Sequence, residues 1–343
     1  MRSPTLILLV VALASITQAR AQTQLSFNIF LPPTHFMWRV FPEWADDVHA
    51  ATGGEVSIVF PARSVSPAHG VLYAVRHGVT DGGLMFNEFL SHGAPGTLMS
   101  QMPWLHRGDS AAISTALWEN YRNEFADFEQ LPGVELLSMF HLGPTYLCSV
   151  TDTPVTTIEE LRRRRVWALP GMIADTLADL DLAIVASPAI QVQELVSRNT
   201  VDVHMGLTLE TIVSFAVASY TRSCVEMNPA FQSASFSVFF NRDAWTGLTQ
   251  RQRAAIEELS GVALSRRLGQ ATNEAEASAR TVLVEEFGVT FAPAGENLRR
   301  ALEEAAASRT EEWKRNVQEA YGVNATEILD TLAADIAART RAD

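Results

Sequence analysis

The sequence predicts an α/β fold of two domains. Residues 154–206 alternate short apolar strands with helices, the order from which α/β domains are built. The chain has 343 residues, enough for two domains of about 100 to 200 residues each. Low-complexity tracts, internal repeats and flexible linkers are absent.

The first 21 residues have the pattern of a secretory signal peptide. Arg2 precedes an apolar run over residues 6–16, and residues 19–21 read Ala-Arg-Ala, a small-residue cleavage signal. The run is shorter than the about 20 residues that span a bilayer. We therefore expect a mature, exported chain that begins at Gln22, with a retained membrane anchor as the alternative.

Residues 154–206 predict two successive strand-helix-strand units. Thr156 or Thr157 is positioned to cap a short helix, with Glu159 and Glu160 in its first turn, where the helix dipole favours anions. Apolar spacing and the breakers Pro170 and Gly171 separate the later elements. The expected order is a strand at 164–169, a helix from 172, a strand at 183–187, a helix from about 188 to 199 and a strand at 201–206.

The C-terminal part is predicted to be helical. Residues 248–286 contain few helix breakers and a cap at Thr249, which predicts one long helix. Residues 298–338 predict two amphipathic helices that are separated near Gly322.

The order of these features resembles the solute receptors of tripartite ATP-independent periplasmic (TRAP) transporters, the DctP-type family. Residues 154–161 read P-x-x-T-x-E-E-L, a basic cluster follows at 162–165 before an apolar strand, and residues 200–202 read Thr-Val-Asp. The family's earlier pattern is matched by Thr52, Gly53, Gly54, Phe60, Pro61, Gly78 and Asp81.

The resemblance implies a two-lobed periplasmic binding protein fold, with strands that cross between the lobes and a long helix that spans both. Lobe I is expected at residues 22–143 plus 233–268. Lobe II is expected at 144–232 plus 269–343, including the C-terminal helices. The solute would bind between the lobes.

Trp167 is the main departure from the family pattern. Relatives carry an arginine at the matching strand position, and that arginine pairs with the carboxylate of the ligand, a geometry that suits guanidinium. Arg165 lies two residues, about 6 to 7 Å, along the strand, so it is a poor replacement. An indole can stack on a ring or hold a cation over its face, while the alternative for Trp167 is a role in the buried core.

Other positions that face the ligand in the family change in the same direction. Phe30 and Phe86 stand where relatives have a polar and an acidic residue, and Tyr146 (or Leu147) stands at a second basic position. The candidate ligand-binding residues are therefore Trp167, Phe86, Asn87, Phe30, Gln191, His204, Met205, Gly206 and Tyr146, with Glu88 and Glu210 as weaker candidates.

Charge and motif content narrow the function further. The formal net charge of -13 disfavours nucleic acid or an anionic membrane as a partner. No nucleophile elbow, zinc-protease, phosphate-loop or metal-cluster motif is present, so neither catalysis nor a cofactor nor a metal is expected. An enzyme remains an alternative only because a carboxylate in the cleft could meet His35, His69 or His77. Cys148 and Cys224 either form a disulfide or remain separate buried thiols.

The sequence thus predicts a periplasmic TRAP receptor that binds a small organic solute and delivers it to the membrane subunits. An aromatic, neutral or cationic solute is favoured over a C4-dicarboxylate, and a monomer is expected. The alternatives are an organic-acid receptor that uses another basic residue, and a receptor that serves a sensor.

Overall fold

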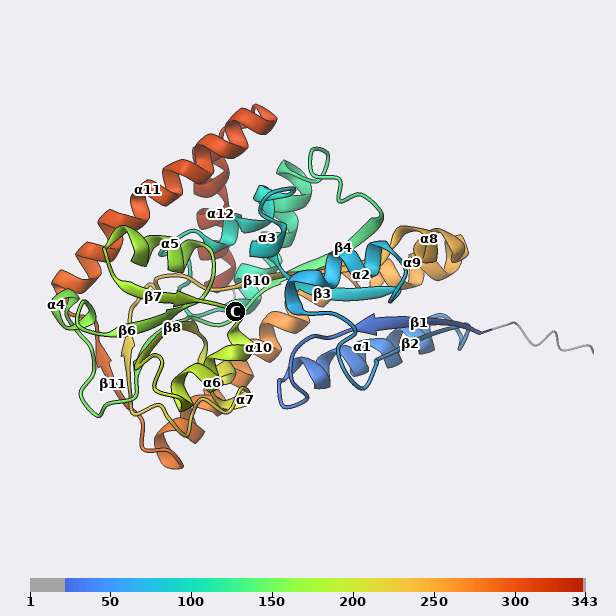
Figure 1. Cartoon of the computed structure of the whole chain (residues 1–343). Coiled ribbons are helices and arrows are strands. Elements are labelled where there is room, and N and C mark those ends of the chain that lie inside the picture. The colour runs from blue at the N-terminus through green and yellow to red at the C-terminus, as the bar shows by residue number, and fades with distance from the viewer. Residues whose placement is uncertain (1–21, 342–343) are drawn as a thin grey trace, which may run out of the picture.

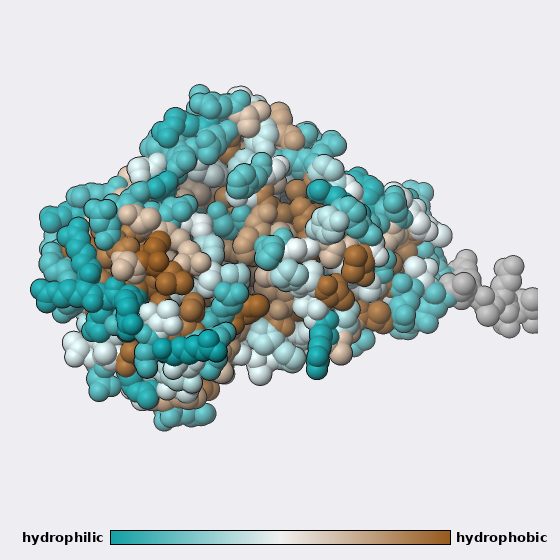
Figure 2. Space-filling view, viewed as in Figure 1, coloured by the Kyte–Doolittle hydropathy of each residue, from teal (hydrophilic) through white to brown (hydrophobic). Residues whose placement is uncertain are grey.

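The computed structural model describes residues 22–341, and the predicted signal peptide lies outside this range. Two β-sheets form the centres of two lobes, and helices cover them (Figure 1). The α/β, two-lobed fold that the sequence predicts is confirmed. In Figure 2, apolar residues gather towards the middle of this face, and hydrophilic residues cover the outer helices.

The first sheet has five strands in the order β2-β1-β3-β10-β4. β1 runs parallel to β2 and β3, whereas β10 is antiparallel to both β3 and β4. The sheet and the helices that accompany it comprise β1 (Thr23–Asn28), α1 (Met37–Ala51), β2 (Val56–Val59), α2 (Val71–Arg76), β3 (Gly82–Phe86), α3 (Ser110–Glu124), β4 (Val134–His141) and β10 (Ser235–Asn241), with 3-10 turns at η1 (Ala68–Gly70), η2 (Asn87–Leu90) and η3 (Pro95–Gln101).

The second sheet has six strands in the order β11-β9-β5-β8-β6-β7. Its parallel part, β6, β7 and β8, has short helices between the strands, as predicted. The elements are β5 (Tyr146–Ser149), α4 (Ile158–Leu161), β6 (Arg165–Ala168), α5 (Met172–Asp179), β7 (Ala183–Ala186), η4 (Ala189–Gln191), α6 (Val192–Ser197), β8 (Val203–Leu207), α7 (Leu209–Ser214), β9 (Ser223–Glu226) and β11 (Thr290–Pro293).

Local chemistry explains two features of the second sheet. Thr157, one of the two predicted caps, begins α4 in a full capping box with Glu160. Cys148 and Cys224 face each other across β5 and β9 and form a disulfide, which decides between the two alternatives that the sequence left open.

The chain passes between the sheets on two segments that lie side by side. Residues 142–145 lead from β4 to β5, and residues 227–234 lead back from β9 to β10. The Leu142 N–H donates to the carbonyl of Ala234 (2.8 Å), and the Thr145 N–H donates to that of Gln232 (3.3 Å). These bonds make the two crossings a short antiparallel ribbon between the lobes.

The predicted single helix at 248–286 is wrong in detail. The chain forms α8 (Arg242–Gly247), α9 (Gln250–Glu258), which Thr249 caps as predicted, and α10 (Gly261–Glu285). Gly261 has a φ of +53° at the start of α10, a conformation that favours glycine and interrupts a continuous helix. α10 alone, of 25 residues, packs against α1, α3 and α7 and so contacts both lobes.

The last two helices are α11 (Glu296–Tyr321) and α12 (Ala325–Thr340). They are separated at Gly322, as predicted, which takes a left-handed conformation. α11 packs on α5 of the second lobe, but α12 packs on α3 of the first. The side chain of Arg339 bonds to Glu119 on α3, so the C-terminal helices do not all sit on lobe II, where the sequence placed them.

Candidate functional site

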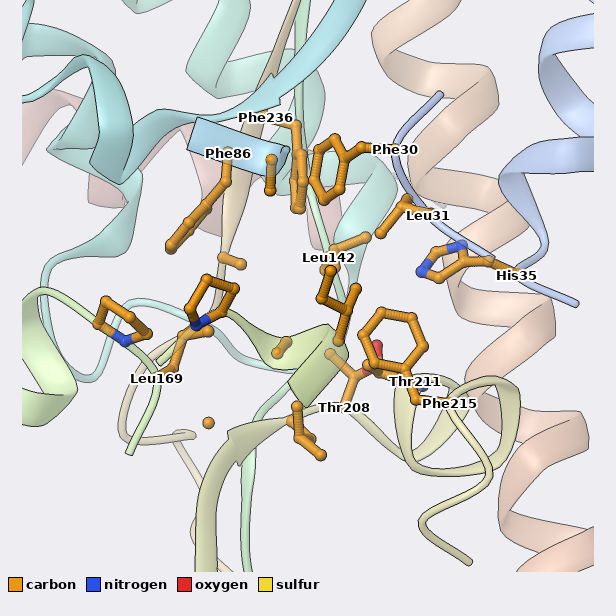
Figure 3. Close-up of a pocket in the computed structure, with 18 of the residues that line it drawn as sticks. Phe30, Leu31, His35, Phe86, Leu142, Leu169, Thr208, Thr211, Phe215 and Phe236 are labelled. Carbon is orange, nitrogen blue, oxygen red and sulfur yellow. The ribbon is translucent and has the colours of Figure 1, made fainter. Parts of the chain in front are cut away.

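A cavity lies between the two sheets, at the ends of strands from both. Figure 3 shows Phe30, Phe86 and Phe236 on the first-lobe side. Phe86 ends β3, Phe236 lies near the start of β10, and Phe30 follows β1. Carboxyl ends of parallel strands are where α/β sheets bind ligands. We call these three residues and Phe89 the ring wall.

The ring wall is held by contacts between aromatic rings. The ring of Phe236 stacks on Phe140 (5.4 Å between centroids) and lies 5.7 Å from that of Phe86. The ring of Phe30 lies 6.3 Å from that of Phe236. Phe86, Phe236 and Phe140 are register partners on neighbouring strands, so one face of the sheet brings them together.

The opposite side of the cavity comes from the second lobe, where β6, β7 and β8 end. Leu169 and Pro170 follow β6, and Pro188 follows β7. Gly206 and Leu207 end β8, and Thr208 and Thr211 begin α7. We call Thr208, Thr211 and Phe215 the threonine wall.

The cavity is almost free of charge. Its volume is about 60 Å³, too small for a peptide or an oligosaccharide. Five phenylalanines line it, and among the described residues His35 is the only ionisable side chain that does so. The residues that line it therefore offer a buried anion no lysine or arginine, and such an anion is costly without a cation.

His35 sits at one end of the cavity and joins the two lobes. Its Nε2 lies 3.2 Å from a carboxyl oxygen of Glu210 on α7, and its Nδ1 accepts the N–H of Met37 (3.4 Å). Burial lowers the pKa of His35 to about 3 and raises the pKa of Glu210 to about 8. An Nδ1 that accepts a bond carries no proton, so the geometry agrees with an uncharged imidazole.

Three of the predicted ligand-binding residues line the cavity: Phe30, Phe86 and Gly206. Gly206 has a φ of +115°, and a Cβ on it would lie 2.5 Å from that of Leu169. The backbone of β8 can thus approach the cavity only because this position has no side chain.

Trp167 does not line the cavity. It is 0% exposed within β6, and its indole N–H donates to the hydroxyl of Ser187 (3.0 Å), directly after β7. The next residues on both strands do reach the cavity, because Leu169, Pro170 and Pro188 line it. The prediction that Trp167 stacks directly on the ligand is therefore wrong, because Trp167 lies behind the residues that line the cavity.

Three further candidates are buried and point elsewhere. The amide of Asn87 bonds to the Thr97 carbonyl and to the hydroxyls of Ser235 and Ser237, so its hydrogen-bonding capacity serves the first sheet. His204 is 0% exposed and contacts Thr221. Met205 is 2% exposed within β8. None of these three side chains lines the cavity, which the alignment with relatives could not show.

The remaining candidates lie outside the cavity. Gln191 is exposed, although the preceding Ala189 and Ile190 line the cavity. Tyr146 packs on Phe291 and interacts with Arg280, away from the lining residues.

Sequence reasoning missed most of the residues that line the cavity. Phe89, Phe215 and Phe236 and the threonines Thr208 and Thr211 carry no motif, and His35 was considered only as a residual catalytic group. The usable signal was position, since Thr208 follows a predicted strand that ends at Gly206, and side chains after such strands often face a ligand.

Two sheets, paired crossings and an apolar cavity between them define a two-lobed solute-binding protein. The chain belongs to the DctP family, described as bacterial extracellular solute-binding protein family 7, whose model matches residues 27–317. Within residues 22–341 the structure holds no helix that is long and apolar enough to cross a membrane, and no cluster of side chains suited to a metal ion.

Known proteins similar to this chain agree with that family. An outer membrane transporter protein, TsaT, of Comamonas testosteroni is 26% identical over 330 residues, 96% of each chain. A TRAP periplasmic solute-binding protein of Bordetella bronchiseptica with bound (R)- and (S)-mandelate is 25% identical, with a TM-score of 0.85 over 94% of this chain and 100% of that one. A TRAP solute-binding protein of Rhodoferax ferrireducens with benzoate shares the fold at 21% identity, with a TM-score of 0.82 over 94% and 99%.

Proposed function

We propose that this receptor captures a small, uncharged aromatic solute in the periplasm and delivers it, as a monomer exported through its N-terminal segment, to TRAP membrane subunits. The observation that carries the proposal is the cavity itself, which five phenylalanines and no lysine, arginine, aspartate or glutamate line among the described residues. Aromatic pairs contribute about 0.5 to 1.5 kcal/mol beyond the burial of their area.

Trp167 supports this proposal indirectly. It stands where relatives have the carboxylate-binding arginine, and its bond to Ser187 joins the ends of β6 and β7. We propose that Trp167 positions the Leu169–Pro170 and Pro188 segments without touching the solute. A cation held over its indole is not supported, because Trp167 is 0% exposed.

An aromatic monocarboxylate is the second candidate. The relative with a TM-score of 0.85 was solved with mandelate, so a ring with one carboxylate fits a similar fold. The absence of a cation beside the cavity argues against this candidate. No lysine or arginine lines the cavity among the described residues, and the nitrogens of His35 face Met37 and Glu210.

A thermal-shift screen of the chain from Gln22 onward tests the aromatic proposal, with benzamide, benzoate and succinate as probes. We expect at least one phenyl compound to raise the Tm, since a ligand at 100 times its Kd stabilises by about 2.7 kcal/mol, and succinate to have no effect. Stabilisation by succinate alone would refute the proposal.

Substitution of one ring that lines the cavity locates the binding. Phe215→Leu should weaken the phenyl hit about fivefold, because it removes one aromatic contact of about 1 kcal/mol. Phe128→Leu is the matched control, since Phe128 is 52% exposed and does not line the cavity. Equal effects of both substitutions would place the solute elsewhere.

A further inference from the structure

The polar and the apolar residues that line the cavity differ in their exposure. Among the described lining residues the polar side chains are nearly inaccessible: His35 is 2% exposed, Thr208 3% and Thr211 6%. Ile190 is 48% exposed, and every other described residue that lines the cavity is buried or half-buried. A side chain that both lines a cavity and meets solvent marks the place where the cavity opens. We call Ile190 and the two residues before it, Pro188 and Ala189, the mouth segment.

The second sheet sets the order of these parts. β8, β6 and β7 are neighbouring parallel strands, and their register places Met205, Ala168 and Ala186 side by side. The residues that line the cavity come just after these three positions. Thr208 follows β8, Leu169 follows β6, and the mouth segment follows β7. The threonine wall and the mouth segment therefore lie at opposite ends of a row, with the end of β6 between them.

The length of this row limits how a solute can lie in it. Neighbouring strands are about 4.8 Å apart, so two strand spacings separate the ends of the row by about 10 Å. Figure 3 shows Leu169 on the other side of the cavity from Thr208 and Thr211. A phenyl ring with one small polar group is shorter than the row. If its polar group lies at the threonine wall, its ring lies over Leu169 and its far end points towards Ile190.

Hydrogen bonding decides which end of the solute lies at which end of the row. The hydroxyls of Thr208 and Thr211 bond to each other at 2.9 Å, and either can be the donor. A hydroxyl can donate and accept, so this end can pair with a polar group of the solute. The side chains of the mouth segment contain no polar atom. Because a buried polar group without a partner is costly, the polar group is expected at the threonine wall.

We propose that the receptor binds phenyl compounds lengthwise, with the polar group at the threonine wall and an apolar para substituent against Ile190. This inference rests on the proposed aromatic function and adds the shape of the solute and a residue that selects it. A meta substituent would point across the row. There it would meet packed side chains, since Leu169 is 7% exposed and Phe86 is 5% exposed.

Isomeric probes test the inference by calorimetry on the chain from Gln22 onward. The probes are benzamide with its meta-methyl and para-methyl derivatives, and benzoate with the same two derivatives. In whichever series binds, we expect the para-methyl compound to bind about threefold more tightly than the unsubstituted one, because it buries one more methyl group. It should bind at least about tenfold more tightly than the meta-methyl isomer, which must displace packed side chains. Equal binding of the isomers would overturn the inference and leave the aromatic function standing. If neither series binds, both proposals fall.

Ile190→Ala tests the mouth segment. The gain from the para-methyl group should disappear, while the affinity for the unsubstituted compound should change less than about twofold. Ile190→Leu should restore the gain. Val284→Ala on α10 is the matched control, because Val284 is 47% exposed and does not line the cavity. A gain that persists in Ile190→Ala would overturn the proposed contact.

Thr211→Val tests the other end of the row. Loss of the hydroxyl should weaken binding of the unsubstituted and the para-methyl compound by the same factor, about threefold to tenfold. The ratio of their affinities should therefore stay constant. A general loosening of the cavity would also erase the gain from the para-methyl group, so this ratio separates the two causes. Unchanged affinity for both compounds would mean that the polar group lies elsewhere and would overturn the proposed orientation.

Discussion

The two walls of the cavity are built on different principles. The ring wall consists of aromatic side chains, with Phe236 at their centre: its ring contacts those of Phe30 and Phe86 and stacks on Phe140 of β4. The threonine wall lies at the start of α7, where the hydroxyls of Thr208 and Thr211 bond to each other and Glu276 accepts the N–H groups of Leu209 and Glu210. Both walls are rigid, the first through packing and the second through directional bonds.

This difference separates affinity from selectivity. Rings that bury apolar area attract any flat apolar solute, because dispersion and the hydrophobic effect have no direction. A hydroxyl discriminates between solutes by the hydrogen bonds that they can make, because an unmatched buried polar group is costly. We expect the ring wall to set how tightly a solute binds and the threonine wall to set which solute it is.

The largest expected effect falls on the ring wall. Phe236→Ala should lower the free energy of unfolding by about 3 to 5 kcal/mol, since it empties a packed aromatic position that is 5% exposed. Urea denaturation measures this change. Phe128→Ala, at 52% exposure, should cost less than about 1 kcal/mol. A loss below about 1 kcal/mol for Phe236→Ala would mean that packing does not hold this wall.

The second lobe has a covalent link that the ring wall lacks. Replacing both Cys148 and Cys224 by alanine removes a disulfide that spans 76 residues, which should cost about 2 to 4 kcal/mol through greater freedom of the unfolded chain. Thermal unfolding of the double variant, compared with the reduced and the oxidised wild type, checks this. If the oxidised and reduced wild type unfold at the same Tm, the link contributes nothing to the second lobe.

A smaller effect is expected behind the threonine wall. Trp167→Phe removes the bond to Ser187 and leaves a small void, so the free energy of unfolding should fall by about 2 kcal/mol. Solute affinity should change less than about threefold, because we place Trp167 behind the cavity lining. Trp118→Phe, on a partly exposed helix face, serves as the control. A tenfold loss of affinity in Trp167→Phe at unchanged stability would show that Trp167 contacts the solute directly.

The smallest effect concerns the contact of His35 with Glu210 at the edge of the threonine wall. Burial raises the pKa of Glu210 to about 8, so the folded state keeps a proton that the unfolded state has lost, and this stabilisation disappears as the pH rises towards 8. His35, whose pKa is lowered to about 3, acts in the opposite direction only below its unfolded value of about 6.5.

The free energy of unfolding of the wild type should therefore fall as the pH rises from 6.5 to 8. In Glu210→Gln this fall should be smaller by about 1 to 2 kcal/mol. Denaturation at a series of pH values measures the slope, which is unaffected by any constant cost of the substitution. Equal slopes for the variant and the wild type would show that Glu210 is ionised in the folded protein throughout this range.

Local sequence patterns predicted much of the fold. The cap at Thr157, the helix end at Gly322 and the succession of strands at 164–169, 183–187 and 201–206 are confirmed within a few residues, because caps, breakers and apolar spacing act over a few positions. The prediction of one continuous helix at 248–286 was wrong because the positive φ of Gly261 breaks it. The presence of a glycine does not by itself predict that conformation.

The site was much less predictable. Alternation along a strand gives two faces, but it does not say which face meets the cavity and which is buried, and Trp167, Asn87 and His204 are buried. Phe236 and Thr211 reach the cavity only because β10 returns to the first sheet and α7 follows β8.

The sequence by itself determined the family and the α/β elements, since these depend on residue identity and order. Only the tertiary structure decided that Cys148 pairs with Cys224, that Trp167 does not line the cavity, and that Thr208 and Thr211 do. Those outcomes depend on contacts between residues far apart in the chain, such as Cys148 and Cys224, which no local pattern encodes.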